Sequence, residues 1–278
     1  MRINEKIILK FKDFLIYEEK SDLTVEKYIR DITNFSNWSA KRGVTKKLLL
    51  EYKDLLIKNY APASVNSIIS SLNTFFMWKK KYDFKIKALK IQKQIFSKED
   101  KELTKEEYKR LLDTAKGMKN QRLYYLMQTI CSTGIRVSEL KFVTVKAVEN
   151  KRAVINLKGK TRIVIIPDKL CLILKDYIKR NNIKDGPVFI TKSGKPLNRS
   201  NIWADMKRLC ESAGVGKEKV FPHNLRHLFA RTYYTIEKDI VRLADILGHT
   251  SVNTTRIYTM EPGEIHRNQI QRLGLLIC

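Results

Sequence analysis

The 278-residue sequence is poor in histidine and cysteine and has no long hydrophobic run. Because no stretch of about 18 apolar residues occurs, the sequence predicts no membrane-spanning helix. The N-terminal segment MRINEKIILKFKDFL alternates charged and apolar residues, so no signal peptide is expected. The few cysteines are too widely spaced for a zinc site or a disulfide framework, which favours a cytoplasmic protein with reduced thiols: Cys131, Cys171, Cys210 and Cys278.

Acidic residues are scarce relative to basic ones. Lysine and arginine number 55 against 29 acidic residues, a formal net charge of +26. The excess is +11 in residues 1–98 and +15 in the remainder, so it is not confined to a basic tail. Basic surfaces bind polyanions because neutralised phosphates release their counterions. The composition therefore predicts a long nucleic acid held by two domains, although charge alone would also suit an RNA-binding protein.

The N-terminal part reads as a helical domain over residues 1–84. In residues 24–41 apolar side chains recur at helical spacing, and Pro62 suits the first turn of a helix over residues 61–83. Residues 85–102 are rich in charge and poor in aromatic residues. We interpret them as a linker along the polyanion, or alternatively as a solvated loop.

The C-terminal domain is predicted to span residues 103–278. Thr104 and Glu107 have the spacing of a capping box at a helix start. Two β-rich runs, residues 153–157 and 162–166, flank KGKT and predict a hairpin. Most of the remaining sequence has helical periodicity, apart from a predicted short strand and turn in DGPVFITKSGKPLN. The fold class is therefore mainly α with a small antiparallel β-sheet.

Histidine or arginine occurs at three places that suit an anion site. In PHNLRH, His223 and Arg226 lie three residues apart and hence on one helix face. Arg136 follows Gly134, which ends one helix, and stands where the next begins. Taken alone, a His–Arg pair at this spacing is usually a surface feature, and Arg136 is also consistent with a surface salt bridge to Glu139.

The segment HTSVNTTRIYT contains the third group, His249 and, nine residues later, Tyr258. A tyrosine near a C-terminus is usually a packing residue. Nothing in the segment by itself marks Tyr258 as a nucleophile.

Four motifs in order, TGIRVSEL, KGKTR, PHNLRHLFA and LGHTSVNTTRIY, resemble those of the tyrosine recombinases, the phage-integrase and Xer-like family. The stretch from TVEKYIRDITNFSNW to SVNSIISSLNTFFMW resembles that family's N-terminal SAM-like core-binding domain. The resemblance implies a site-specific recombinase that cleaves and rejoins double-stranded DNA through a 3′-phosphotyrosine. It further implies a tetramer on two DNA sites, with no cofactor and no metal.

The resemblance also implies the catalytic set. It assigns Tyr258 as nucleophile, Arg136 and Arg226 as phosphate ligands, His223 as proton acceptor and His249 as a phosphate-facing or orienting group. A hairpin lysine would protonate the leaving 5′-oxygen. KGKTR is shorter than the family's usual loop, which leaves both Lys158 and Lys160 as candidates. We select Lys158 because it retains the Lys-Gly pair.

No step of the reaction is assigned to one further histidine and two further tyrosines. His227 is interpreted as structural, and Tyr233 and Tyr234 as core residues. The tail after Tyr258 is apolar at several positions, and we expect it to pack on a neighbouring protomer, or alternatively on its own subunit.

Several functional alternatives stay open at this point. They are a type IB topoisomerase, which uses similar chemistry, and a DNA-binding protein that does not cleave. Chromosome-dimer resolution is not distinguished from integration or excision of a mobile element. The sequence leaves no room before its first predicted helix for an arm-binding domain, so arm sites are not expected.

Overall fold

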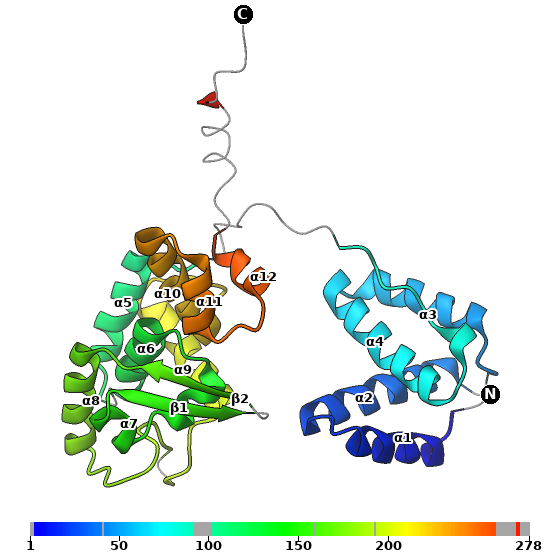
Figure 1. Ribbon diagram of the computed structural model, residues 1–278, viewed down its shortest axis with the longest axis horizontal. Helices are drawn as coiled ribbons and strands as arrows, with labels where there is room; N and C mark the ends of the chain where they lie inside the picture. Colours follow the sequence, from blue (N-terminus) through cyan, green and yellow to red (C-terminus); the bar gives the residue numbers. More distant parts are fainter. Residues whose placement is uncertain are drawn as a thin grey trace, which may run out of the picture. The chain divides into compact units, whose positions relative to one another are not determined.

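The computed structural model describes residues 3–40, 42–91, 102–119, 121–157, 160–191, 193–259 and 271–272. The chain divides into two compact units, residues 1–93 and 94–278 (Figure 1). Each unit has its own hydrophobic core. None of the described helices is both long enough and apolar enough to span a bilayer.

The N-terminal unit contains the four helices expected from the sequence. They are α1 (Glu5–Tyr17), α2 (Asp22–Ser39), α3 (Lys46–Asn59) and α4 (Pro62–Trp78), followed by a short 3-10 helix, η1 (Tyr82–Phe84). Pro62 begins α4 as predicted. The α4 face that carries Leu72 and Phe75 is buried against α1 and α2, and the Phe11 ring meets Phe75 edge-on at 5.1 Å. Aromatic packing of this kind holds the helical bundle together.

The first residues of the predicted linker are fixed to α4. The Asn73 side chain bonds the backbone of Ile86 in both directions, and Asn66 does the same for Leu89. Ile86 is fully buried in the N-terminal core. Residues 92–101 lie outside the described residues.

The C-terminal unit is mainly helical with one small antiparallel sheet, which confirms the predicted fold class. Its elements are α5 (Lys105–Lys116), α6 (Arg122–Thr133), η3 (Val137–Phe142), α7 (Val145–Glu149), β1 (Arg152–Leu157), β2 (Lys160–Ile165), α8 (Asp168–Arg180), α9 (Arg199–Ser212), α10 (Pro222–Glu237), α11 (Ile240–Leu247), α12 (Val252–Thr255) and η4 (Arg256–Tyr258).

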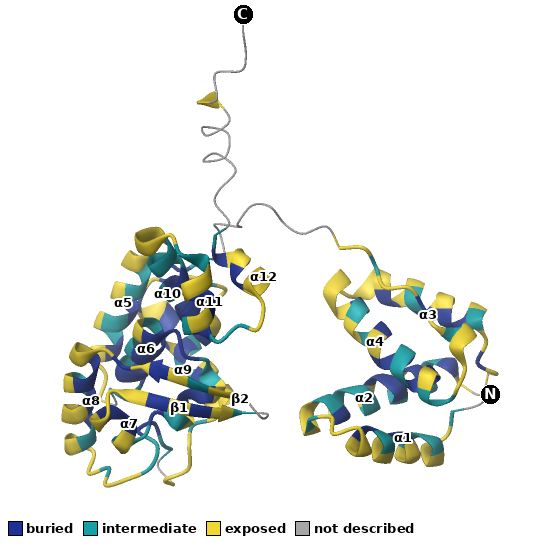
Figure 2. Ribbon diagram, viewed as in Figure 1, coloured by how far each residue is buried: buried dark blue, intermediate teal, exposed yellow. Residues whose placement is uncertain are grey.

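Among the described helices of this unit, α6 is the most deeply buried. It packs against α5, α8, α9 and α10, and its buried residues are coloured dark blue on the ribbon in Figure 2. The predicted capping box is present at the start of α5, where Thr104 and Glu107 exchange side-chain and backbone hydrogen bonds. The pairing of α6 with α10 matters for function, because the predicted site residues follow α6 and lie on α10.

The predicted hairpin is present, with strand limits that differ by a few residues. Strands β1 and β2 pair antiparallel, with Ile155 opposite Arg162 and Leu157 opposite Lys160. Strand β2 thus begins two residues earlier than predicted, because the connection is shorter than KGKT. The strand predicted within residues 185–198 was wrong: only isolated bridges occur among its described residues, Thr144 with Pro187 and Ile190 with Pro196.

Candidate active site

Two glycines set the positions of the loops that carry the site. Gly134 ends α6 and Gly248 ends α11, each with a positive φ, +61° and +63°. After α11 the backbone N–H of His249 donates to the Ala244 carbonyl at 2.9 Å, the pattern of a Schellman motif. A Cβ at Gly134 would lie 2.6 Å from the Phe229 ring. Both turns therefore need glycine, for backbone conformation and for space.

Arg226 is buried at the centre of the site. Its guanidinium donates to the Gly134 carbonyl at 2.5 Å, to the Leu247 carbonyl at 2.8 Å and to His249 Nε2 at 3.0 Å. Only 1% of the residue is exposed. One side chain from α10 thus joins the C-terminal ends of α6 and α11. Carbonyls at a helix end carry negative partial charge, which favours a cation there.

His249 connects Arg226 to the segment that carries Tyr258. Because a guanidinium can only donate, His249 Nε2 must accept, and the neutral ring carries its proton on Nδ1. That nitrogen lies 2.8 Å from the Thr255 hydroxyl, which accepts. The His249 ring also stacks on the Tyr258 ring, with centroids 6.1 Å apart and planes 15° apart.

Tyr258 also contacts a histidine of α10. The His227 ring meets the Tyr258 ring at 4.9 Å in a T-shaped arrangement, and the His223 ring meets His227 at 4.5 Å. His223 and His227 are one helical turn apart on α10. Tyr258 is 3% exposed, and its hydroxyl interacts with the Arg226 guanidinium. The structure therefore places the predicted nucleophile among three histidines and a buried arginine.

Arg136 and Glu139 form an ion pair beside the site. Arg136 precedes the 3-10 helix η3, and its guanidinium lies 3.1 Å from Glu139 Oε1 and 3.4 Å from the Gly248 carbonyl. The alternative reading of this pair was a surface salt bridge. The ion pair exists, but the Glu139 side chain is only 5% exposed. Its second oxygen accepts from Arg162 on β2 at 2.5 Å.

Burial, together with the nearby positive charge, lowers the pKa values of the three histidines in the site. Burial, with further contributions from Arg226 and Arg136, lowers the pKa of His223 below its ordinary value and that of His249 to about 4. Burial likewise lowers the pKa of His227 to about 4 and that of Arg226 to about 10. At neutral pH the site therefore contains neutral imidazoles beside charged guanidiniums.

Five predicted residues share this site: Arg136, His223, Arg226, His249 and Tyr258. Lys158 lies outside the described residues, and for Lys160 only the backbone is described, at the start of β2. Tyr233 and Tyr234 are half-buried and pack against the hydrophobic cluster that includes Tyr258.

Sequence reasoning missed two participants, Arg162 and Thr255. Arg162 was used only to measure the length of the KGKTR loop, and Thr255 was not considered. The sequence signal that could have identified Arg162 was its place in the KGKTR motif. No sequence signal marked Thr255.

Comparison with known proteins identifies the family. The chain matches the Phage integrase family over residues 101–262, and that family's N-terminal SAM-like domain over residues 8–82. The chain belongs to the phage integrase family.

Similar proteins cover nearly the whole chain. Tyrosine recombinase XerA of Pyrococcus furiosus is 27% identical over 284 residues, which cover 99% of this chain and 96% of that protein. Tyrosine recombinase XerD of Xanthomonas axonopodis pv. citri is 28% identical over 279 residues, covering 90% and 89%.

Solved integrase structures share the fold. A lambda integrase dimer bound to a core site has a TM-score of 0.75 at 18% identity, covering 94% of this chain and 96% of that one. XerH bound to its difH substrate before cleavage has a TM-score of 0.71 at 22% identity, covering 93% and 82%.

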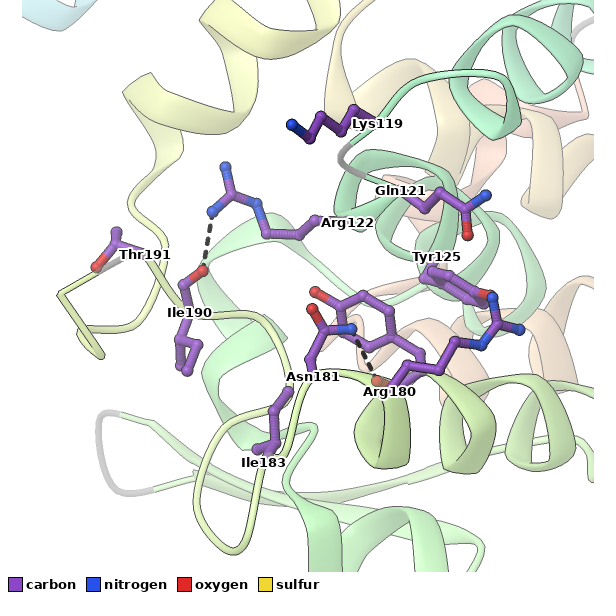
Figure 3. Close-up of a pocket in the computed structure, with 10 residues that line it drawn as sticks. Lys119, Gln121, Arg122, Tyr125, Arg180, Asn181, Ile183, Ile190 and Thr191 are labelled. Atoms are coloured by element: carbon purple, nitrogen blue, oxygen red, sulfur yellow. Dashed lines mark hydrogen bonds between the residues drawn. The ribbon is translucent and has the colours of Figure 1, made fainter.

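A separate cavity lies at the other end of α6, about 18 Å from the site for a 12-residue helix. Its volume is about 740 Å³, and Arg122, Tyr125, Tyr177 and Arg180 line it (Figure 3). Arg122 donates to the Ile190 carbonyl at 2.9 Å and pairs with Asp205, and Arg180 pairs with Asp176. Its arginines thus already have protein partners.

Acidification should destabilise the catalytic unit of this integrase-family protein. An unfolded histidine binds a proton near pH 6.5, whereas folded His227 and His249 do so only near pH 4. Between these values the unfolded state holds more protons, so stability is present above pH 6.5 and is lost as pH falls toward 4. Thermal melts at pH 7.5, 6 and 5 should show a falling melting temperature.

The variant His227→Gln isolates one contribution. Its melting temperature should fall less over the same pH interval than that of the unmodified protein. An equal or larger loss would contradict the assignment of His227 as a buried neutral histidine.

Proposed function

We propose that this protein is a site-specific DNA recombinase that cleaves and rejoins double-stranded DNA through a 3′-phosphotyrosine. The observation that carries the proposal is the packing of Tyr258 against His249 and His227, beside buried Arg226. This cluster places a tyrosine hydroxyl beside fixed positive charge, and the His223 ring, the proposed proton acceptor, packs against His227 next to it. A packing tyrosine would need none of these neighbours.

The arginines bind the phosphodiester that is cut. Negative charge grows on its two non-bridging oxygens in the transition state, and forked guanidinium donors stabilise it. Arg136 is the more accessible of the two, with 37% of its side chain exposed. Arg226 is held in place by two helix ends. A phosphate reaches Arg226 and Tyr258 only after the Tyr258 segment shifts, because both residues are buried.

Tyr258 attacks the phosphorus while His223 takes the hydroxyl proton. The lowered pKa of His223 keeps its ring neutral and able to accept a proton at neutral pH. The tyrosine O–P bond forms, and the bond to the 5′-oxygen breaks. The leaving oxygen takes a proton from the hairpin lysine, for which Lys158 is the proposed residue.

His249 acts as an orienting group in this state. Its Nε2 accepts from Arg226 and its Nδ1 donates to Thr255, so neither nitrogen is left for a phosphate. Rejoining reverses the cleavage, when a 5′-hydroxyl of the partner duplex attacks the phosphotyrosine. The bond energy is conserved through the covalent intermediate.

We further propose a tetramer that holds two DNA sites in the cytoplasm. An apolar pocket of about 470 Å³ lies among α5, α6 and α10, lined by Tyr108, Leu228, Phe229 and Ile236. The apolar residues of the tail, Ile265, Ile270, Leu273, Leu275 and Leu276, lie outside the described residues. We assign this pocket on a neighbouring protomer as their docking site.

Charge placed in the pocket should weaken assembly on DNA. Ile236 is 69% exposed, so Ile236→Asp should fold normally yet disfavour an apolar partner segment. Native mass spectrometry of protein–DNA complexes should show fewer tetramers and unchanged single-protomer binding. The control is Leu172→Asp on α8, equally exposed at 68% and outside the pocket. Equal assembly of both variants would contradict the proposed docking site.

The proposed function is tested with a nicked suicide substrate that carries the cognate site. Cleavage releases a short strand, and the protein should remain attached to DNA on a denaturing gel. Exchange of strands between two labelled duplexes should follow with intact sites. Relaxation of supercoils without exchange would indicate a topoisomerase, and DNA binding without an adduct would indicate a non-cleaving protein.

A further inference from the structure

Arg162 links strand β2 of the hairpin to two other elements at the site, η3 and α11. It lies on β2 opposite Ile155, and its side chain is 16% exposed. One guanidinium nitrogen donates to Glu139 Oε2 at 2.5 Å, and another donates to the Ile246 carbonyl at 2.8 Å. A single side chain thus joins β2 to η3 and to the end of α11.

The α11 turn is shaped to accept this side chain. A Cβ at Gly248 would lie 2.4 Å from Arg162 Cδ and 2.9 Å from its Nε. The glycine therefore leaves space for the arginine to lie directly against the turn that precedes His249. Replacement of Gly248 by alanine would displace Arg162 as well as strain the backbone.

Glu139 divides its charge between two arginines. Its Oε1 pairs with Arg136 at 3.1 Å, while its Oε2 pairs with Arg162. These two arginines help to hold the pKa of the buried carboxyl below its usual range, against the effect of burial. Glu139 therefore fixes the distance between the hairpin and the proposed phosphate ligand Arg136.

Arg162 is poorly placed to bind a phosphate itself. Both terminal nitrogens already donate to protein oxygens, and its Nε is buried without a hydrogen-bond partner in the described part of the chain. Its effect on the reaction must pass through the elements that it joins. The hairpin is the element that carries the proposed proton donor of the leaving 5′-oxygen.

We propose that Arg162 is a positioning residue that holds strand β2 against η3 and α11, so that the hairpin lysine protonates the leaving 5′-oxygen. The proposal rests on the proposed recombinase function. It predicts that the largest defect is in leaving-group protonation, because Arg136 keeps its own contacts with Glu139 and Gly248 when Arg162 is replaced. An Arg162 variant would keep Arg226 to bind the phosphate and Tyr258 to attack it.

A substrate with sulfur at the bridging 5′ position tests this directly. Attack by tyrosine then breaks a P–S bond, and the thiolate leaves without a proton because a thiol has a pKa of about 8.5. With the ordinary oxygen substrate, Arg162→Gln should slow single-turnover cleavage by about 10²- to 10⁴-fold, the usual contribution of general acid catalysis. With the sulfur substrate its rate should approach that of the unmodified protein.

Arg136→Gln is the matched control. It removes a phosphate ligand from the same Glu139 pair, so it should be slow on both substrates. Both substrates are given to one enzyme preparation, and the ratio of their rates therefore does not depend on the folded fraction. Arg162→Lys, a milder change, keeps the charge but cannot reach both Glu139 and Ile246, and should show the same selective recovery.

The possible outcomes separate this proposal from the proposed function. Equal slowing of Arg162→Gln and Arg162→Lys on both substrates would overturn the positioning role, as would full activity of both variants on the oxygen substrate. If the unmodified protein forms no adduct with either substrate, the recombinase function fails and the role of Arg162 fails with it.

Discussion

The variant Tyr258→Phe should form no covalent adduct with DNA, yet fold and bind DNA, with a melting temperature lowered only by loss of the contact between the hydroxyl and Arg226. The substitution removes only the hydroxyl, and the ring can keep its contacts with His249 and His227. Without the oxygen no bond to phosphorus can form, so the expected loss is complete rather than partial. The measurement is a denaturing gel of the suicide-substrate reaction, together with a binding isotherm and a thermal melt.

Two nearby tyrosines supply the control for that result. Tyr233 and Tyr234 lie on α10 and pack against the same hydrophobic cluster. Phenylalanine at either position should leave adduct formation within about twofold, because surface and partly buried hydroxyls contribute little. An adduct that persists in Tyr258→Phe and disappears in one of these variants would reassign the nucleophile.

Arg226→Lys should lose both cleavage activity and stability. Lysine keeps the charge but cannot reach the Gly134 and Leu247 carbonyls and His249 Nε2 together. Breaking one partner of a buried charged network costs about 3–5 kcal/mol of unfolding free energy. Loss of a transition-state donor should lower the cleavage rate by about 10²- to 10³-fold as well.

Arg231→Lys separates these two effects. Arg231 is also on α10 and is half-buried, but it pairs with Glu102 and the Leu103 carbonyl, away from Tyr258. This variant should lose stability and keep its cleavage rate per folded molecule. Chemical denaturation gives the first quantity and single-turnover cleavage at saturating protein gives the second. If Arg226→Lys cleaved normally per folded molecule, Arg226 would be structural only.

Helix positions were predictable because they depend on local patterns. Pro62 at the start of α4 and the Thr104–Glu107 capping box act within one turn of chain, so the sequence contains the whole interaction. The hairpin was predicted with less accuracy at its connection. Its strand limits depend on cross-strand pairing, which Ile155 and Arg162 make and which spacing alone does not determine.

The sequence predicted which residues lie together, but not that Arg226 and Tyr258 are buried. Three-residue spacing placed His223 and Arg226 on one face of α10. It could not indicate that this face packs against two helix ends, so the burial of Arg226 and Tyr258 emerged only from the structure. Arg162 was missed for the same reason, since its partners Glu139 and Ile246 are distant in sequence.

Identification of the DNA-linked residue tests the central claim most directly. The adduct from the suicide substrate should be digested with nuclease and protease, and its peptides sequenced by mass spectrometry. We predict a single nucleotide-bearing peptide with a 3′-phosphoryl group on Tyr258. A nucleotide on any other residue, or an adduct joined through the 5′ end of DNA, would contradict the account.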